Sequence, residues 1–185
     1  MLRVISGTAR SIPLKTLPSS DTRPTTDRVK ETLFNLLQDE IYGCSFLDLF
    51  AGSGQIGIEA LSRGATEAVF IEKNKKACAI IEENLKKTRF SEKAVLISKD
   101  YKVALSFLSK KFDVIFMDPP YAANVEADVL QLIDSHDLLK DDGMVIIEAA
   151  LKKDFSFVED LPFAIMRTKV YKTNQHVFLR RLSNE

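Results

Sequence analysis

The stretch Asp48-Leu49-Phe50-Ala51-Gly52-Ser53-Gly54-Gln55-Ile56-Gly57 indicates the fold of this 185-residue chain. It follows an apolar run and opens an amphipathic one, so its glycines stand between a predicted strand and a predicted helix. The spacing Gly52-x-Gly54-x-x-Gly57 lets the backbone turn sharply and approach a ligand closely, because a Cβ at these points would intrude. In that setting the pattern favours a nucleotide-like ligand over tight packing alone.

Apolar runs alternate with amphipathic stretches on the carboxyl side of this loop, which predicts repeated β-α units and a largely parallel, doubly wound sheet. The five predicted parallel strands are Phe46–Phe50, Ala68–Glu72, Ala94–Ile97, Phe112–Met117 and Met144–Ile147. The predicted helices between them are Ile56–Arg63, Lys75–Thr88, Val103–Leu108 and Val125–Ile133.

The pattern changes after Pro162. Phe163–Tyr171 and His176–Leu182 both favour strands, and residues 172–175 between them are typical of a hairpin turn. A terminal antiparallel hairpin on a parallel sheet resembles the topology of class I methyltransferases, which use S-adenosylmethionine (SAM). We therefore predict an α/β fold of this Rossmann-like class with a seven-stranded sheet. A dinucleotide-binding dehydrogenase is disfavoured, because no residues remain for its substrate domain.

The first forty residues are predicted to form a small arm and one helix. Leu2–Leu17 resembles a short hairpin broken at Gly7, and Thr25 or Thr26 can cap a helix from Asp27 to Asp39. A length of 185 residues with 45% hydrophobic content is typical of one globular domain. We expect a single methyltransferase domain over residues 1–185, with a cover for RNA and cofactor at 1–40 and a catalytic core at 45–182.

The formal net charge of zero conceals a basic character at both ends of the chain. Residues 1–30 hold six lysines or arginines against two acids, and residues 161–185 hold five against one. Such ends can form a phosphate-binding rim around an acidic core, and scattered solvated charge is an equal alternative. No run of about eighteen apolar residues and no apolar signal core occurs, which predicts a cytoplasmic protein without a membrane span.

Neither the cysteines nor the histidines indicate a chemical site. Cys44 and Cys78 have no CxxC spacing and no histidine cluster near them, so we expect buried, unreactive side chains and neither a disulfide nor a metal site. His136 and His176 are far apart in the sequence and have no obvious partner, and we expect both to be solvated or capping side chains.

Acidic residues near the carboxyl ends of the first three predicted strands suggest which ligand the loop holds. Asp48 would repel a pyrophosphate, but it can accept hydrogen bonds from the ammonium of a methionine moiety, which favours SAM over NAD. Glu72 stands where an acid grips two ribose hydroxyls, in NAD and SAM alike. Asp100 could accept a hydrogen bond from an adenine amino group, with Tyr101 beside it, or it could cap the next helix. The expected cofactor-binding residues are Asp48, Phe50, Gly52, Ser53, Gly54, Gly57, Glu72, Lys73, Asp100 and Tyr101.

Asp118-Pro119-Pro120-Tyr121 follows the most apolar predicted strand, at the edge where open α/β sheets bind ligands. The prolines fix an extended turn, so that a carboxylate, a carbonyl and an aromatic ring project toward one point. This arrangement fits methylation of an amino group on a base ring, because the two acceptors draw electron density onto a poorly nucleophilic nitrogen while the tyrosine stacks on the base. We expect Asp118 to be ionised, with an ordinary pKa of about 3.9. Asp118, Pro119 and Tyr121 are the predicted catalytic residues. The alternative is a rigid turn with a surface tyrosine.

Together these motifs resemble amino-methyltransferases that act on adenine or guanine in nucleic acids. Arg3-Val4-Ile5-Ser6-Gly7 and Thr22-Arg23-Pro24-Thr25-Thr26-Asp27-Arg28-Val29-Lys30-Glu31-Thr32-Leu33-Phe34-Asn35 resemble the RsmD family, bacterial enzymes that methylate the N2 amine of one guanine in small-subunit ribosomal RNA. The segments Leu47–Gly54 and Glu59–Gly64 extend the match over most of the chain. One departure is that the family's usual Arg-Gly-Arg after the first glycine reads Arg10-Ser11-Ile12 here.

The resemblance implies SAM as methyl donor, S-adenosylhomocysteine as product and a partly assembled small ribosomal subunit as substrate. It also implies that Arg23-Pro24-Thr25 lies beside the cofactor and the flipped base. The expected substrate-binding residues are Arg10, Arg23, Pro24, Thr25, Arg28, Pro120 and Tyr121. We expect the protein to be a monomer.

Three alternatives stay open at this point. A DNA adenine methyltransferase would share the Asp-Pro-Pro-Tyr chemistry, but its usual separate target-recognition domain has no room in this sequence. A methyltransferase for a small-molecule or protein amine is disfavoured by the basic ends and by Tyr121. A non-catalytic RNA-binding module on the same fold would keep its function without Asp118. The choice of guanine over adenine rests on the resemblance alone.

Overall fold

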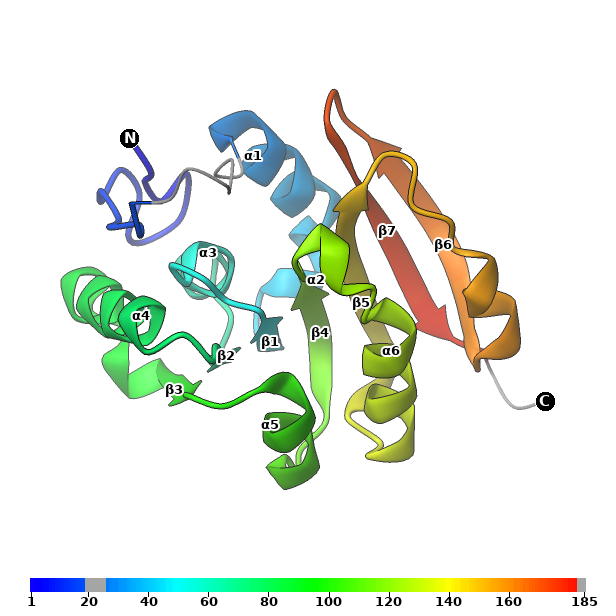
Figure 1. Cartoon of the computed structure of the whole chain (residues 1–185). Helices are drawn as coiled ribbons and strands as arrows, with labels where there is room; N and C mark the ends of the chain where they lie inside the picture. The colour runs from blue at the N-terminus through cyan, green and yellow to red at the C-terminus, as the bar shows by residue number, and fades with distance from the viewer. Residues whose placement is uncertain (19–25, 183–185) are drawn as a thin grey trace.

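The computed structural model describes residues 1–18 and 26–182, and it shows one sheet with helices on both faces (Figure 1). The predicted substrate residues Arg23, Pro24 and Thr25 lie outside the described residues. The helices are α1 (Asp27–Leu36), α2 (Gln38–Ile41), α3 (Gln55–Ser62), α4 (Lys75–Thr88), α5 (Tyr101–Phe107) and α6 (Glu126–Ser135). The strands are β1 (Ser45–Leu49), β2 (Glu67–Ile71), β3 (Ala94–Ile97), β4 (Phe112–Met117), β5 (Leu139–Ala150), β6 (Phe163–Val170) and β7 (Asn174–Arg181). Three short 3-10 helices are η1 (Ser91–Lys93), η2 (Tyr121–Ala123) and η3 (Ser156–Asp160).

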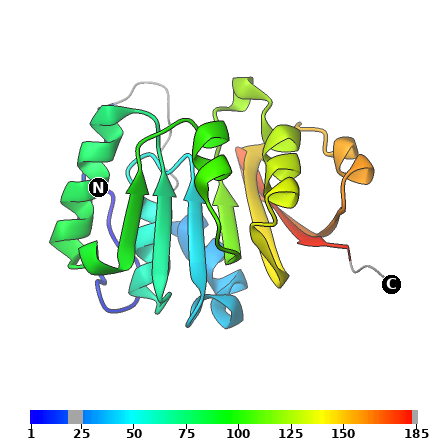
Figure 2. The same cartoon turned by 90° about the horizontal axis from the view of Figure 1, so that it is seen from below.

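The seven strands form one sheet in the order β3-β2-β1-β4-β5-β7-β6. Strands β1 to β5 pair in parallel, and β7 runs antiparallel to both β5 and β6. The strand order reverses at β1, which has β2 on one side and β4 on the other. Ligands of open α/β sheets bind at such a switch point, outside the carboxyl ends of the strands, and Figure 2 shows the arrowheads of β1 to β4 along one edge. The predicted fold class and terminal hairpin are confirmed.

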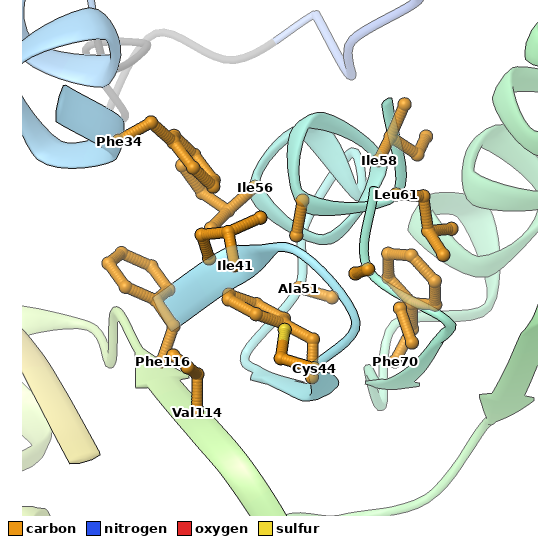
Figure 3. Packing of buried hydrophobic residues seen from close by; sticks show 14 of the residues in the cluster. Phe34, Ile41, Cys44, Ala51, Ile56, Ile58, Leu61, Phe70, Val114 and Phe116 are labelled. Carbon is orange, nitrogen blue, oxygen red and sulfur yellow. The ribbon is translucent and has the colours of Figure 1, made fainter. Parts of the chain in front are cut away.

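Two buried apolar clusters hold the helices against the two faces of the sheet. In the first cluster, Phe34 of α1, Ile58 of α3 and Ile81 of α4 pack on one face together with Phe70 and Phe116 of the strands (Figure 3). The second cluster joins α5 and α6 to the other face. All five residues of β1 are buried because helices cover both faces of the sheet. Both cysteines are buried, as predicted.

The predicted N-terminal helix is divided in two. Helix α1 begins after Thr26, whose Oγ1 accepts a hydrogen bond from the Val29 N–H at 3.3 Å, and it ends at Leu36. Leu37, with φ −102° and ψ 6°, stands between α1 and α2. The prediction of one continuous helix from Asp27 to Asp39 is therefore wrong at Leu37, and helical structure resumes after it in α2. The break is consistent with packing, because Leu37 and Ile41 are both buried in the first cluster.

The N-terminal arm forms a short hairpin with one isolated bridge, and it packs on α3. Glu59 of α3 is fully buried and accepts hydrogen bonds from the N–H groups of Ile5 at 2.8 Å and Ser6 at 3.0 Å. The ammonium of Lys30 in α1 lies 3.6 Å from the same carboxylate. One buried carboxylate thereby joins the arm, α1 and α3.

Strand β5 is longer than predicted, since it extends over Leu139–Ala150. It pairs with β4 on one side and with β7 on the other. The hairpin turn is also displaced, because Asn174 and Gln175, predicted to lie in the turn, are buried residues of β7. In the described ranges, no helix is both long enough and apolar enough to cross a membrane.

Candidate active site

The glycine loop joins β1 to α3, where the sequence predicted it. Gly52 and Gly54 have φ angles of +57° and +76°, which L side chains rarely adopt. A Cβ on Gly52 would meet no described atom within 4 Å, so the space beside this residue is open to a ligand. A Cβ on Gly57 would lie 2.3 Å from Cε1 of Phe70, so this glycine is required for packing α3 on β2, and its contact with the cofactor stays a prediction.

Asp48 lies at the carboxyl end of β1, next to the loop. Its side chain is 2% exposed, and its Oδ2 accepts a hydrogen bond from the Gly57 N–H at 2.9 Å. Burial raises the pKa of Asp48 to about 8, opposed by this hydrogen bond and assisted by the charge of Glu72. A nearby positive charge would restore the ionised form, so this carboxyl group fits a cationic partner.

Two side chains from neighbouring elements hold the loop in its conformation. Glu72, which follows β2, accepts hydrogen bonds from the N–H groups of Gly52 at 2.9 Å and Asn74 at 2.8 Å. Asn84 of α4 is fully buried and donates to the Ser53 carbonyl at 2.9 Å. Sequence reasoning did not identify Asn84. The signal was its position on the apolar stripe of α4, because a buried amide must find hydrogen-bond partners.

Phe50 and Tyr101 form an aromatic pair beside the loop, with ring centroids 5.3 Å apart. Phe50 has φ +60°, and such strain in a bulky residue is concentrated at ligand-binding sites. The Tyr101 hydroxyl donates to Asp128 at 2.6 Å. Asp100 caps α5, because its Oδ1 accepts a hydrogen bond from the Lys102 N–H at 3.1 Å. Its Oδ2 lies 3.8 Å from the Lys73 ammonium. The capping alternative for Asp100 is therefore present, and its contact with an adenine stays a prediction.

The Asp118-Pro119-Pro120-Tyr121 motif follows β4, the neighbour of β1, so the motif and the glycine loop lie side by side at the switch point. The N–H of Asp118 donates to the carbonyl of Leu49 in β1 at 3.5 Å. Pro119 is buried, whereas Pro120 is exposed. Tyr121 begins η2 and is 49% exposed, which leaves its ring available to a partner.

The charge environment of Asp118 differs from our expectation of an ordinary pKa, which was wrong. Burial raises the pKa of Asp118 well above its usual value, although part of the side chain reaches solvent, and the charges of Glu148 and Asp48 raise it further. The same surroundings raise the pKa of Tyr121 to about 12. The sequence did not show that carboxyl groups from three adjacent strands, β1, β4 and β5, meet at one edge.

A second correction concerns His176, which we expected to be solvated or to cap an element. Its ring is fully buried, and its Nε2 lies 2.8 Å from Oε2 of Glu148. Glu148 is 5% exposed and stands opposite His176 in the ladder between β5 and β7. Sequence reasoning missed both residues because the register of the hairpin brings them together. His136 is exposed at the end of α6, as expected.

The predicted substrate-binding residues are only partly gathered at this edge. Pro120 and Tyr121 lie there as part of the motif, and Arg28 is exposed on α1. Next to Arg10, the N–H of Ala9 in the arm donates instead to the hydroxyl of Ser62, the last residue of α3. This point is about 12 Å along α3 from the glycine loop, because each helical residue adds about 1.5 Å. The described structure therefore does not bring Arg10 to the loop.

The sheet order, the glycine loop after β1 and the carboxyl group after β4 define a class I SAM-dependent methyltransferase fold. Within this class, the chain belongs to the family described as conserved hypothetical protein 95, whose model matches residues 2–180, and this is the RsmD family.

Individual relatives agree with this assignment. The chain is 41% identical over 150 residues to a putative rRNA methyltransferase of Bacillus subtilis, a match that covers 80% of this chain and 82% of that protein. It is 36% identical over 174 residues to ribosomal RNA small subunit methyltransferase D of Haemophilus influenzae, covering 91% and 88%. A solved structure of a putative methyltransferase from Escherichia coli matches with a TM-score of 0.85 at 28% identity over 99% of both chains.

Proposed function

We propose that this chain transfers the methyl group of SAM to the exocyclic N2 amine of a guanine in small-subunit ribosomal RNA. One observation carries the proposal: the glycine loop after β1 and the Asp118 motif after β4 lie side by side at the switch point of the sheet. Relatives named as ribosomal RNA methyltransferases support RNA as the substrate. The choice of guanine and of its N2 amine rests on the resemblance to the RsmD family.

The residues around the glycine loop fit SAM. Asp48 is buried and its pKa is raised, so the positively charged ammonium of the methionine part of SAM would stabilise its ionised form. Glu72 can accept from ribose hydroxyls with the lone pairs that its two backbone hydrogen bonds leave over. The strained Phe50 and its partner Tyr101 offer an aromatic surface to the adenine. When bound, SAM supplies an electrophilic methyl group on a positively charged sulfur.

The Asp118 motif fits an aromatic amine as the acceptor of that methyl group. The carboxylate of Asp118 and the carbonyl of Pro119 can accept the two N–H bonds, which aims the nitrogen lone pair at the methyl group. One proton must leave the nitrogen when its bond to carbon forms, and a carboxylate with a raised pKa accepts this proton more readily than an ordinary one. Tyr121 is exposed enough to stack on a base that has been flipped out of its helix.

The proposal includes the oligomeric state of the enzyme, its place in the cell and the form of its substrate. The enzyme would act as a monomer in the bacterial cytoplasm on a partly assembled small subunit. An adenine N6 amine could make the same two hydrogen bonds, so adenine is the alternative acceptor that an experiment must separate from guanine.

The test is transfer of labelled methyl groups from SAM to small ribosomal subunits prepared from cells that lack this enzyme, followed by nucleoside analysis. We expect N2-methylguanosine, and we expect the Asp118→Ala variant to form it much more slowly. N6-methyladenosine would keep the chemistry and reject guanine. Absence of transfer to subunits and to naked ribosomal RNA, with SAM binding intact, would reject the proposal.

A further inference from the structure

Four polar side chains form a network between β5 and the turn of the terminal hairpin, where β7 begins. His176 Nε2 lies 2.8 Å from Oε2 of Glu148, and Asn174 Nδ2 donates to Oε1 of the same carboxylate at 2.7 Å. The Tyr171 hydroxyl lies 3.1 Å from His176 Nδ1. Glu148, His176 and Asn174 are all less than 8% exposed, whereas Tyr171 reaches the surface in part. Both oxygens of the carboxylate and both nitrogens of the ring therefore have partners.

This network lies directly beside Asp118. Strands β4 and β5 are parallel, with Phe116 opposite Ile146 and Met117 opposite Ile147, so the next two residues, Asp118 and Glu148, are neighbours at the end of the ladder. Side chains two positions apart along a strand share a face, so Asp118 lies on the face of Phe116. The ring of His176 contacts Phe116 edge-on, with centroids 6.1 Å apart. The charge of Glu148 contributes to the raised pKa of Asp118.

The hydrogen bonds around His176 allow the ring to exist in two charge states. An ionised Glu148 can only accept, so Nε2 must carry a hydrogen. In the neutral ring, Nδ1 accepts from the Tyr171 hydroxyl; in the charged ring, Nδ1 donates to the same oxygen, and the hydroxyl turns its own hydrogen away. Either charge state of the ring is therefore compatible with both contacts. A buried histidine without such a rotatable partner would lose a hydrogen bond in one of the two states.

We propose that Glu148 and His176 act as one buried unit that sets whether Asp118 is ionised. With a proton on His176 the unit is neutral, and Asp118 can carry its negative charge beside it. Without that proton the unit is negative and disfavours a second charge on Asp118, because like charges in a desolvated place repel strongly. Glu148 and His176 are then positioning residues for methyl transfer, and in this sense the inference rests on the proposed function.

Other titratable groups in the described part of the chain face this corner and must be considered with the unit. Asp48 of β1 also disfavours a charge on Asp118. Tyr121 of η2 and Tyr171 beside β7 both have pKa values raised to about 12, by burial first and by Glu148 next, so both stay neutral at ordinary pH. Among these groups, only His176 can add a positive charge.

The test is a pH titration of Asp118 in the free protein, monitored by NMR of carbon-labelled aspartate carboxyl groups. The Asp118→Asn variant assigns the Asp118 signal. In Glu148→Gln the midpoint of Asp118 should move to lower pH by about one unit, because a like charge is lost. In His176→Gln it should move to higher pH by about one unit, because the amide still bonds Glu148 but cannot neutralise it. The double variant should behave like Glu148→Gln alone. Shifts in the same direction, or none, would overturn the proposal.

Controls separate this inference from the proposed function. His136→Gln is the matched substitution at an exposed histidine, and it should leave the midpoint unchanged. If His176→Gln does not fold, Tyr171→Phe should move the midpoint in the same direction by a smaller amount, since it removes the partner of the charged ring; an unchanged or lowered midpoint there would overturn the inference as well. The acid limb of the rate of methyl transfer should follow the same shifts. If the Asp118 midpoint moves as expected but the wild type transfers no methyl group, the proposed reaction is rejected and the role of Glu148 and His176 stands. If the wild type transfers methyl groups but the midpoint does not move, the role of Glu148 and His176 is rejected.

Discussion

Binding of SAM should be linked to the loss of a proton from Asp48. Burial raises the pKa of this carboxyl group to about 8, so the ionised form makes up about 1% of the free protein at pH 6 and about a quarter at pH 7.5. If the ammonium of SAM binds only to the ionised form, the apparent dissociation constant is the intrinsic one divided by that fraction. Affinity should therefore rise about twentyfold between these pH values, which corresponds to about 1.8 kcal/mol.

Calorimetry measures both parts of this prediction. Titrations of SAM in two buffers of different ionisation enthalpy should show release of nearly one proton near pH 7, and the range below pH 7.5 keeps the amine of SAM itself largely protonated. Methylthioadenosine, which lacks the amino-acid part, should bind without this slope. Asp48→Asn should bind SAM with an affinity that does not depend on pH. A flat wild-type profile, or a slope that the Asn variant retains, would show that SAM binding is not linked to the ionisation of Asp48.

Three further predictions concern single side chains. Asp118→Ala should lower the single-turnover rate of methyl transfer by about 10²- to 10⁴-fold and leave SAM affinity unchanged in calorimetry; a loss of SAM binding would assign this residue to the cofactor instead. Asp48→Asn should raise the free energy of unfolding in urea by up to about 4 kcal/mol at pH 7 and by less than about 1 kcal/mol near pH 4. The folded-state pKa of about 8 lies above the ordinary 3.8, so the wild type loses stability as pH rises between the two values. An equal gain at both pH values would contradict this cause. Gly57→Ala should cost about 1–3 kcal/mol because its Cβ would lie 2.3 Å from the Phe70 ring, whereas Gly52→Ala should cost only about 1 kcal/mol for its positive φ; thermal denaturation compares the two, and the reverse order would contradict the packing argument.

Elements defined by local patterns were predicted well. Helix α4 has the predicted limits, Lys75–Thr88, because its apolar spacing and its cap at Asn74 are properties of the segment itself. Strand β5 was predicted too short, since residues 140–142, which follow its buried first residue Leu139, are polar and exposed and interrupt the apolar pattern. The break at Leu37 was missed because it depends on what α1 and α2 pack against.

In the candidate site, the positions of the acidic residues could be predicted from the sequence, but their charge states could not. Asp48, Glu72 and Asp118 could be assigned to one edge because each lies near the carboxyl end of an apolar run predicted to be a parallel strand, and the carboxyl ends of such strands meet. Their charge states could not be assigned, because a pKa depends on burial and on carboxyl groups that neighbouring strands contribute. The packing role of Gly57 could not be predicted, because nothing in the sequence places Phe70 against it.

Sequence alone was enough to predict the order of strands and helices along the chain, the loop that follows β1 and the motif that follows β4, because these depend on periodicity and on residues a few positions apart. The folded structure was needed to show that α1 stops at Leu36, that Asp118 lies among carboxyl groups and that His176 is buried against Glu148. The difference lies in the range of the interactions. Hydrophobic periodicity and helix capping act within one segment, whereas desolvation, charge repulsion and strand register arise from groups that approach each other only when the chain is folded.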